Sequence, residues 1–100
     1  MRKHKAPNPY REAYKQYAET QLTLEEILST FKDYTIYSIL DNTTLYIVEG
    51  NTVILLFDSI GYEDDDCMPD IYEAYPAHGE CFNTICDRYL YDGCSIMKLN

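Results

Sequence analysis

The stretch YTIYSILDNTTLYIVEGNTVILLFD, residues 34–58, decides the fold. It holds three runs rich in β-branched and aromatic residues, YTIYSIL, TTLYIVE and TVILLFD. Such residues favour strands because they pack well on a pleated, half-buried surface. The pairs Asp41-Asn42 and Gly50-Asn51 separate the runs and tolerate the positive φ of tight hairpin turns. The stretch therefore predicts a three-stranded antiparallel meander.

The segment before the meander has the pattern of an amphipathic helix. Asn8 and Pro9 fit the cap and the first helical position. Thr23 and Glu26 fit a capping box, so the segment is either one long helix or two helices with a break near residues 20–23. A stripe at steps of three and four is expected to pack on one face of the sheet: Tyr10, Tyr14, Tyr17, Gln21, Leu24, Leu28 and Phe31.

The segment after the meander allows more than one interpretation. The letters MPD, residues 68–70, fit the start of a short helix that would run through Ala74. Asp92 and Gly93 lie between apolar runs and form a two-residue hairpin signal. The alternative is a helix, because apolar residues also fall at helical spacing before this pair: Phe82, Ile85, Cys86, Tyr89 and Leu90. We favour a short helix near residues 81–91, which Gly93 would cap, followed by an edge strand over 94–99.

The predicted fold class is α+β. It has an N-terminal helix, or two, packed on a three- to four-stranded antiparallel sheet, with a short C-terminal helix and an edge strand. Because a chain of 100 residues has room for one modest core, we expect a single domain over residues 1–100. Residues 1–8 are expected to form a basic flexible arm.

The net charge of −9 is unevenly spread along the chain. Residues 1–32 carry six bases and four acids, a balance of +2, whereas residues 33–100 carry two bases and thirteen acids, a balance of −11. Such a field repels nucleic acid and anionic membranes and speeds encounter with basic proteins. The charge therefore predicts a basic protein partner and no direct nucleic-acid or membrane partner.

The acids concentrate in GYEDDDCMPDIYEAY, residues 61–75, which holds six carboxylates, three tyrosines and no lysine or arginine. One interpretation is a solvated acidic loop. The other is a contact surface, because tyrosine rings among carboxylates suit a partner rich in arginine and lysine. The predicted partner-binding residues are Tyr62, Glu63, Asp64, Asp65, Asp66, Asp70, Tyr72, Glu73 and Tyr75. A further set of tyrosines is expected to fill the core: Tyr10, Tyr14, Tyr17, Tyr37 and Tyr46.

One histidine and three cysteines lie close together in the sequence, as His78, Cys81, Cys86 and Cys94. Zinc takes four such donors at tetrahedral corners, but the paired Cys-x2-Cys units typical of structural zinc are absent from the sequence. We expect thiols that pack in the fold, with a zinc site as the alternative, and no cofactor. We also expect the acidic surroundings to raise the thiol pKa values, which argues against a cysteine nucleophile. No catalytic residues are predicted.

The N-terminal sequence MRKHKAPNPYREAY passes from basic to polar residues without the apolar segment of a secretory signal. The sequence also has no apolar run of about 18 residues. We therefore expect a cytoplasmic protein whose cysteines are not paired in disulfides.

In size, in the acidic balance of residues 33–100 and in the stretch GYEDDDCMPDIYEAY, the chain resembles small acidic phage-encoded inhibitors of host defence. These include anti-CRISPR and anti-restriction proteins of the DNA-mimic type. The resemblance implies an inhibitor in the bacterial cytoplasm that blocks the nucleic-acid channel of a CRISPR or restriction nuclease. Toxin-immunity proteins follow the same logic and are an alternative, as is a small zinc-binding regulatory module.

Overall fold

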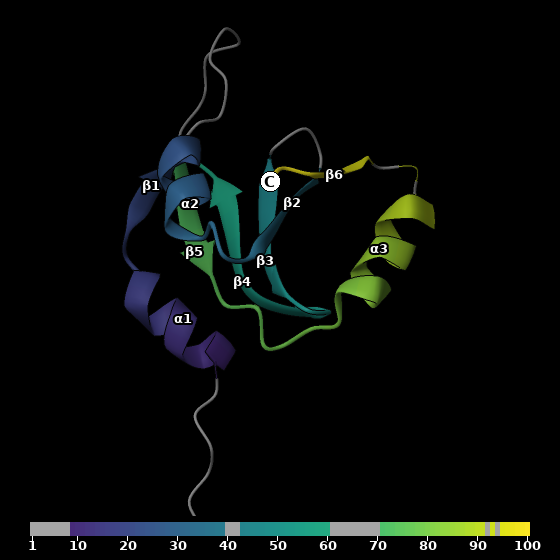
Figure 1. Cartoon of the computed structure of the whole chain (residues 1–100), viewed down its shortest axis with the longest axis horizontal. Coiled ribbons are helices and arrows are strands. Elements are labelled where there is room, and N and C mark those ends of the chain that lie inside the picture. The colour runs from purple at the N-terminus through teal and green to yellow at the C-terminus, as the bar shows by residue number, and fades with distance from the viewer. Residues whose placement is uncertain (1–8, 40–42, 61–70, 92, 94) are drawn as a thin grey trace, which may run out of the picture.

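One antiparallel sheet of six strands, in the order β1-β5-β4-β3-β2-β6, forms the framework of the computed structural model (Figure 1). The structure describes residues 9–39, 43–60, 71–91, 93 and 95–100. The elements in chain order are α1 (Pro9–Tyr17), β1 (Gln21–Thr23), α2 (Leu24–Thr30), β2 (Thr35–Ile39), β3 (Thr44–Glu49), β4 (Thr52–Ser59), β5 (Ile71–Tyr75), α3 (Phe82–Tyr91) and β6 (Ile96–Lys98).

The predicted meander is confirmed as β2, β3 and β4, which pair in sequence order. Gly50 has a φ of 65° in the turn between β3 and β4, a left-handed conformation that glycine adopts without strain. Consecutive residues of β3 and β4 are buried, and because side chains along a strand point to alternate faces, both faces of these strands contribute to a core. A register shift beside Ile47 and Val48 places both Ile54 and Leu55 in the same core cluster.

The prediction of three or four strands was wrong, because β1 and β5 were missed. Residues 71–74, expected as the end of a helix, lie in β5 instead, which pairs with β4 on one side and β1 on the other. The sequence of β5 alternates, so Tyr72 and Ala74 are buried while Ile71 and Tyr75 are exposed. Pairing with a central strand therefore prevails over the helix-start signal at residues 68–70.

The N-terminal segment forms two helices, one of the two predicted alternatives. The break contains β1, and the predicted capping box starts α2. Thr23 Oγ1 accepts a hydrogen bond from the Glu26 N–H at 3.1 Å, and Glu26 Oε1 accepts one from the Thr23 N–H at 2.8 Å. Helix α1 begins at Pro9 as predicted, while its expected cap, Asn8, lies outside the described residues.

Helices α1 and α2 cover one face of the sheet. Ile27 of α2 and Phe31, which caps the end of that helix, are buried against strand residues that include Phe57, and the ring centroids of Phe31 and Phe57 lie 5.7 Å apart. Tyr14 and Tyr17 of α1 pack on the edge of the same cluster, which confirms their predicted core role.

Helix α3 covers part of the opposite face, next to the meander and β6. Phe82 stacks on Tyr37 with ring centroids 4.2 Å apart, and it also contacts Tyr46. The predicted C-terminal helix and edge strand are thus confirmed. Gly93, with a φ of 85°, donates a hydrogen bond to the Leu90 carbonyl at 3.0 Å, as expected for a residue that ends a helix.

Candidate partner-binding surface

The acidic connection between β4 and β5 begins and ends at one point of the sheet. The Ile60 N–H donates to the Ile71 carbonyl at 2.9 Å, so the chain leaves and re-enters the sheet between neighbouring residues. Residues 61–70 lie outside the described residues. Six of the predicted partner-binding residues fall there: Tyr62, Glu63, Asp64, Asp65, Asp66 and Asp70.

The structure overturns the prediction that Tyr72 contacts a partner. Its side chain is completely buried beneath α1 and α2, in the cluster that contains Ile27 and Phe57. The physical reason is the two-residue repeat of a strand, which sends Tyr72 to the core face and its neighbours to the other face.

Glu73 and Tyr75, the other two predicted residues, lie together on the other face of β5. Tyr75 is 43% exposed, and its hydroxyl donates a hydrogen bond of 3.4 Å to Glu73 Oε1. The negative charge of Glu73 is the main reason why the pKa of Tyr75 is raised, since it disfavours a second negative charge nearby.

Asp58 joins this pair, and sequence reasoning missed it. It lies directly opposite Glu73 in the ladder between β4 and β5, and residues in such positions have Cβ atoms about 5 Å apart. Asp58 Oδ1 accepts a hydrogen bond from the Thr44 hydroxyl at 3.2 Å. The signal that would have found Asp58 is the strand register, which depended on recognising β5.

We call the surface formed by Leu56, Asp58, Ile71, Glu73 and Tyr75 the acidic sheet face. Strand alternation places these five residues on the same side of β4 and β5. Asp58 and Glu73 are half-buried, and in the described part of the chain neither pairs with a lysine or arginine. Two close carboxylates with accepting lone pairs still available can receive a cation such as a guanidinium group.

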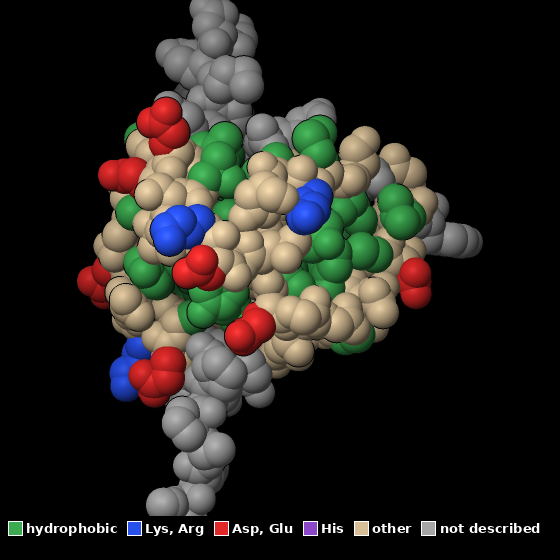
Figure 2. All heavy atoms as spheres, in the orientation of Figure 1, with side chains coloured by type: hydrophobic (Ala, Val, Ile, Leu, Met, Phe, Trp, Pro, Cys, Tyr) green, Lys and Arg blue, Asp and Glu red, His purple; other side chains and the backbone are tan. Residues whose placement is uncertain are grey.

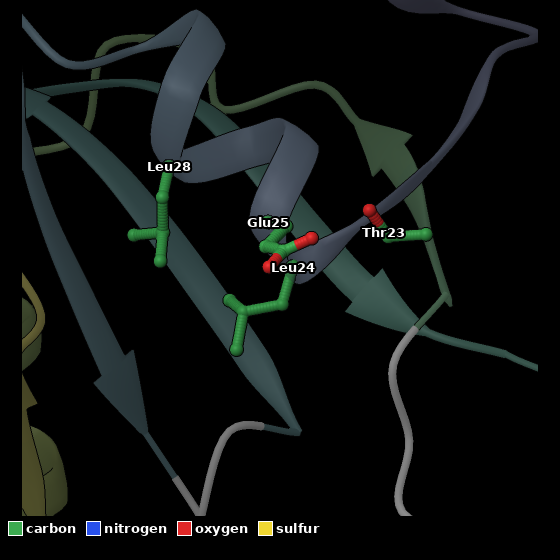
Figure 3. A pocket seen from close by; sticks show the side chains of 4 residues that line it. All are labelled: Thr23, Leu24, Glu25 and Leu28. Carbon is green, nitrogen blue, oxygen red and sulfur yellow. The ribbon is translucent and has the colours of Figure 1, made fainter.

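The face of the molecule that carries α1 and α2 has a different character. Figure 2 shows lysine and arginine side chains there, lying among the acidic ones. A hollow of about 300 Å³ also lies at the start of α2, lined by Thr23, Leu24, Glu25 and Leu28. Leu24 and Leu28 point to the same side of the helix (Figure 3). This open hollow offers few polar groups to orient a ligand.

Residues of the predicted zinc set are spread over different surroundings. His78 is exposed, with a φ of 58°, while Cys86 is half-buried against the core beneath α3, as predicted for a packing thiol. Cys94 lies outside the described residues. Within the described ranges, no three His, Cys, Asp or Glu residues are grouped closely enough to hold a metal ion.

Cys81 is exposed at the amino end of α3, and the expectation of a raised pKa is wrong for it. Hydrogen bonds from the backbone amides of Thr84 and Asn83 lower the pKa of its thiol, because they stabilise the thiolate. Asn51 Nδ2 adds a hydrogen bond to the sulfur at 2.8 Å. Burial, by contrast, raises the pKa of Cys86.

Comparisons with known proteins give no relative by which to interpret these surfaces, so their function is inferred from their side chains. The chain matches no family model, and no significant match was found among curated proteins or solved structures. In the ranges that the structure describes, no helix is both long enough and apolar enough to cross a membrane.

Proposed function

We propose that the protein is a stoichiometric inhibitor that binds a basic, nucleic-acid-handling partner by charge mimicry. The partner is a nuclease of a CRISPR or restriction system, and the inhibitor acts in the bacterial cytoplasm. The proposed activity is binding, so no chemical step is assigned to the chain. One observation carries the proposal: the Asp58–Glu73 pair on β4 and β5 lies beside the point where the acidic connection of residues 61–70 begins and ends.

The charge distribution supports a basic partner. Residues 33–100 have a balance of −11, and cationic surfaces that normally hold phosphates are attracted by clustered carboxylates. The contact would combine residues 61–70 with Glu73 and Tyr75. Charge would give fast, salt-sensitive association, and aromatic or apolar side chains would slow dissociation.

The test uses a charge reversal within the acidic connection. Tagged wild-type protein and an Asp64→Lys, Asp65→Lys, Asp66→Lys variant are each used to capture proteins from a bacterial host lysate. The nuclease captured by the wild type is then assayed with DNA, and we expect inhibition at one inhibitor per binding site that fades as salt rises. The variant should weaken inhibition by about tenfold or more.

The matched control makes three charge reversals elsewhere, Glu12→Lys, Glu19→Lys and Glu25→Lys, all at exposed positions. A folded triple variant that inhibits as well as the wild type would refute charge mimicry. If the inhibited partner proves to be a toxin made by the same cell, the chain is instead a toxin-immunity protein. Stoichiometric zinc in the purified protein, lost in Cys81→Ser, would favour the metal-binding alternative.

A further inference from the structure

The acidic sheet face continues across four strands as a polar row. Thr44, Asp58, Glu73 and Gln21 lie in register on β3, β4, β5 and β1. Leu56 and Tyr75 form the next row on one side. Ile71, which is 40% exposed, lies on the other side of Glu73 along β5. Glu73 thus lies between an aromatic ring and an aliphatic side chain on β5, with the carboxylate of Asp58 directly opposite it on β4.

Among the described elements, α3 leaves this part of the sheet uncovered. Helix α3 packs over the side of the sheet toward β2, where Phe82 contacts Tyr37 and Tyr46, and of the acidic sheet face it is Leu56 that packs against the edge of this cluster. Figure 1 shows α3 on the far side of the meander from β5 and β1. The exposure of Ile71 and Tyr75 agrees with this arrangement.

The side chains of the acidic sheet face favour arginine over lysine as the group that binds there. Like charges directly opposite each other on neighbouring strands repel, and a cation placed between them removes the repulsion. The planar guanidinium of arginine presents several donors at once and stacks on aromatic rings, whereas the ammonium of lysine is a compact, strongly hydrated charge. Tyr75 supplies the ring, and Asp58 with Glu73 supplies acceptors for the fork of donors.

We propose that the acidic sheet face is a docking surface for an arginine side chain of the protein partner, received between Asp58 and Glu73 and stacked on Tyr75. This inference rests on the proposed function, which it deepens by naming the recognised group. The charge complementarity of the two carboxylates with a guanidinium group carries it, together with the exposed apolar side chains that flank them.

A short peptide of alternating arginine and glycine is the probe, with a lysine–glycine peptide of equal length for comparison. Heteronuclear NMR of the full chain should show shifts at Asp58, Ile71, Glu73 and Tyr75, and tighter binding of the arginine peptide. The variant Asp58→Asn, Glu73→Gln should weaken arginine-peptide binding by about tenfold. A control that loses the same charge elsewhere, Glu49→Gln with Asp87→Asn, should weaken it by about twofold or less.

Three outcomes would overturn the docking proposal: equal affinity for both peptides, equal weakening by the control, or shifts that leave Asp58, Glu73 and Tyr75 unmoved. The NMR shifts are measured on the wild-type protein, so this third outcome can be tested even if a variant fails to fold. If the Asp58→Asn, Glu73→Gln variant still inhibits the captured nuclease fully while the Asp64, Asp65, Asp66 reversal does not, the docking surface is refuted and the proposed function survives. A wild type that binds the arginine peptide at this face but inhibits no nuclease refutes only the function.

Discussion

Cys81 lies where the amino end of α3 meets the turn between β3 and β4. The Val53 N–H donates to the Glu80 carbonyl at 2.8 Å, and the Phe82 N–H donates to the Asn51 carbonyl at 2.7 Å. These bonds fix the thiol beside backbone amides that stabilise its anion. Local hydrogen bonding therefore outweighs the negative charge of the whole chain at this one atom.

We predict that Cys81 is alkylated at lower pH than Cys86. The lowered pKa of Cys81 means that its thiolate is present below the ordinary thiol value of about 8.5, whereas the raised pKa of Cys86 delays ionisation until above it. Mass spectrometry of iodoacetamide-treated protein over a pH series gives both profiles from one sample. Thr84→Val, which removes a hydroxyl that also lowers this pKa, should move only the Cys81 profile upward. Identical profiles for the two thiols would contradict the assignment.

The two tyrosines of β5 are predicted to have opposite roles. Tyr72→Ala removes a fully buried ring and should lower the free energy of unfolding by about 3 kcal/mol or more. Tyr75→Ala truncates an exposed ring and should leave the melting temperature almost unchanged while weakening arginine-peptide binding. Thermal melts and binding titrations of both variants are the measurements, and a Tyr75→Ala protein that melts like Tyr72→Ala would contradict the prediction.

At the scale of elements, β4 and β5 place two negatively charged residues opposite each other. Because Asp58 and Glu73 lie opposite each other, we predict that Glu73→Gln raises the free energy of unfolding by about 0.5 kcal/mol at low salt. The gain should shrink as salt screens the repulsion. Glu49→Gln is the control, since Glu49 lies opposite the neutral Thr52. Denaturant unfolding at two salt concentrations measures both variants, and a Glu73→Gln protein no more stable than the wild type would count against the repulsion.

Elements with strong local signals were predictable from the sequence. The meander follows from β-rich runs separated by turn pairs, and the start of α2 follows from the spacing of Thr23 and Glu26. Strands β1 and β5 were not predictable in this way, because each is short and is stabilised by pairing with a partner far away in the chain. The missed strand β5 also hid two facts about the site, the burial of Tyr72 and the approach of Asp58 to Glu73.

At the scale of the whole molecule, the sequence predicted the α+β class but underestimated the sheet. Charge counting indicated an acidic protein, but a count along the sequence does not say which charged side chains share a face of the folded molecule. It therefore could not distinguish the mixed charges on the face of α1 and α2 (Figure 2) from the paired carboxylates of the acidic sheet face. Position came from register, which depends on contacts between residues far apart in sequence.

The pairing of β1 with β5 also sets the order in which a growing chain can complete its fold. A ribosome synthesises α1, β1 and α2 before the meander, and β1 has no strand to join until β5 follows. The apolar sides of α1 and α2 therefore stay exposed until the strands that bury them have been synthesised. Pairings between segments that are this far apart in the sequence form late and slowly. A nascent chain that stalls before β5 would present those sides, including Ile27 and Phe31, to chaperones and proteases.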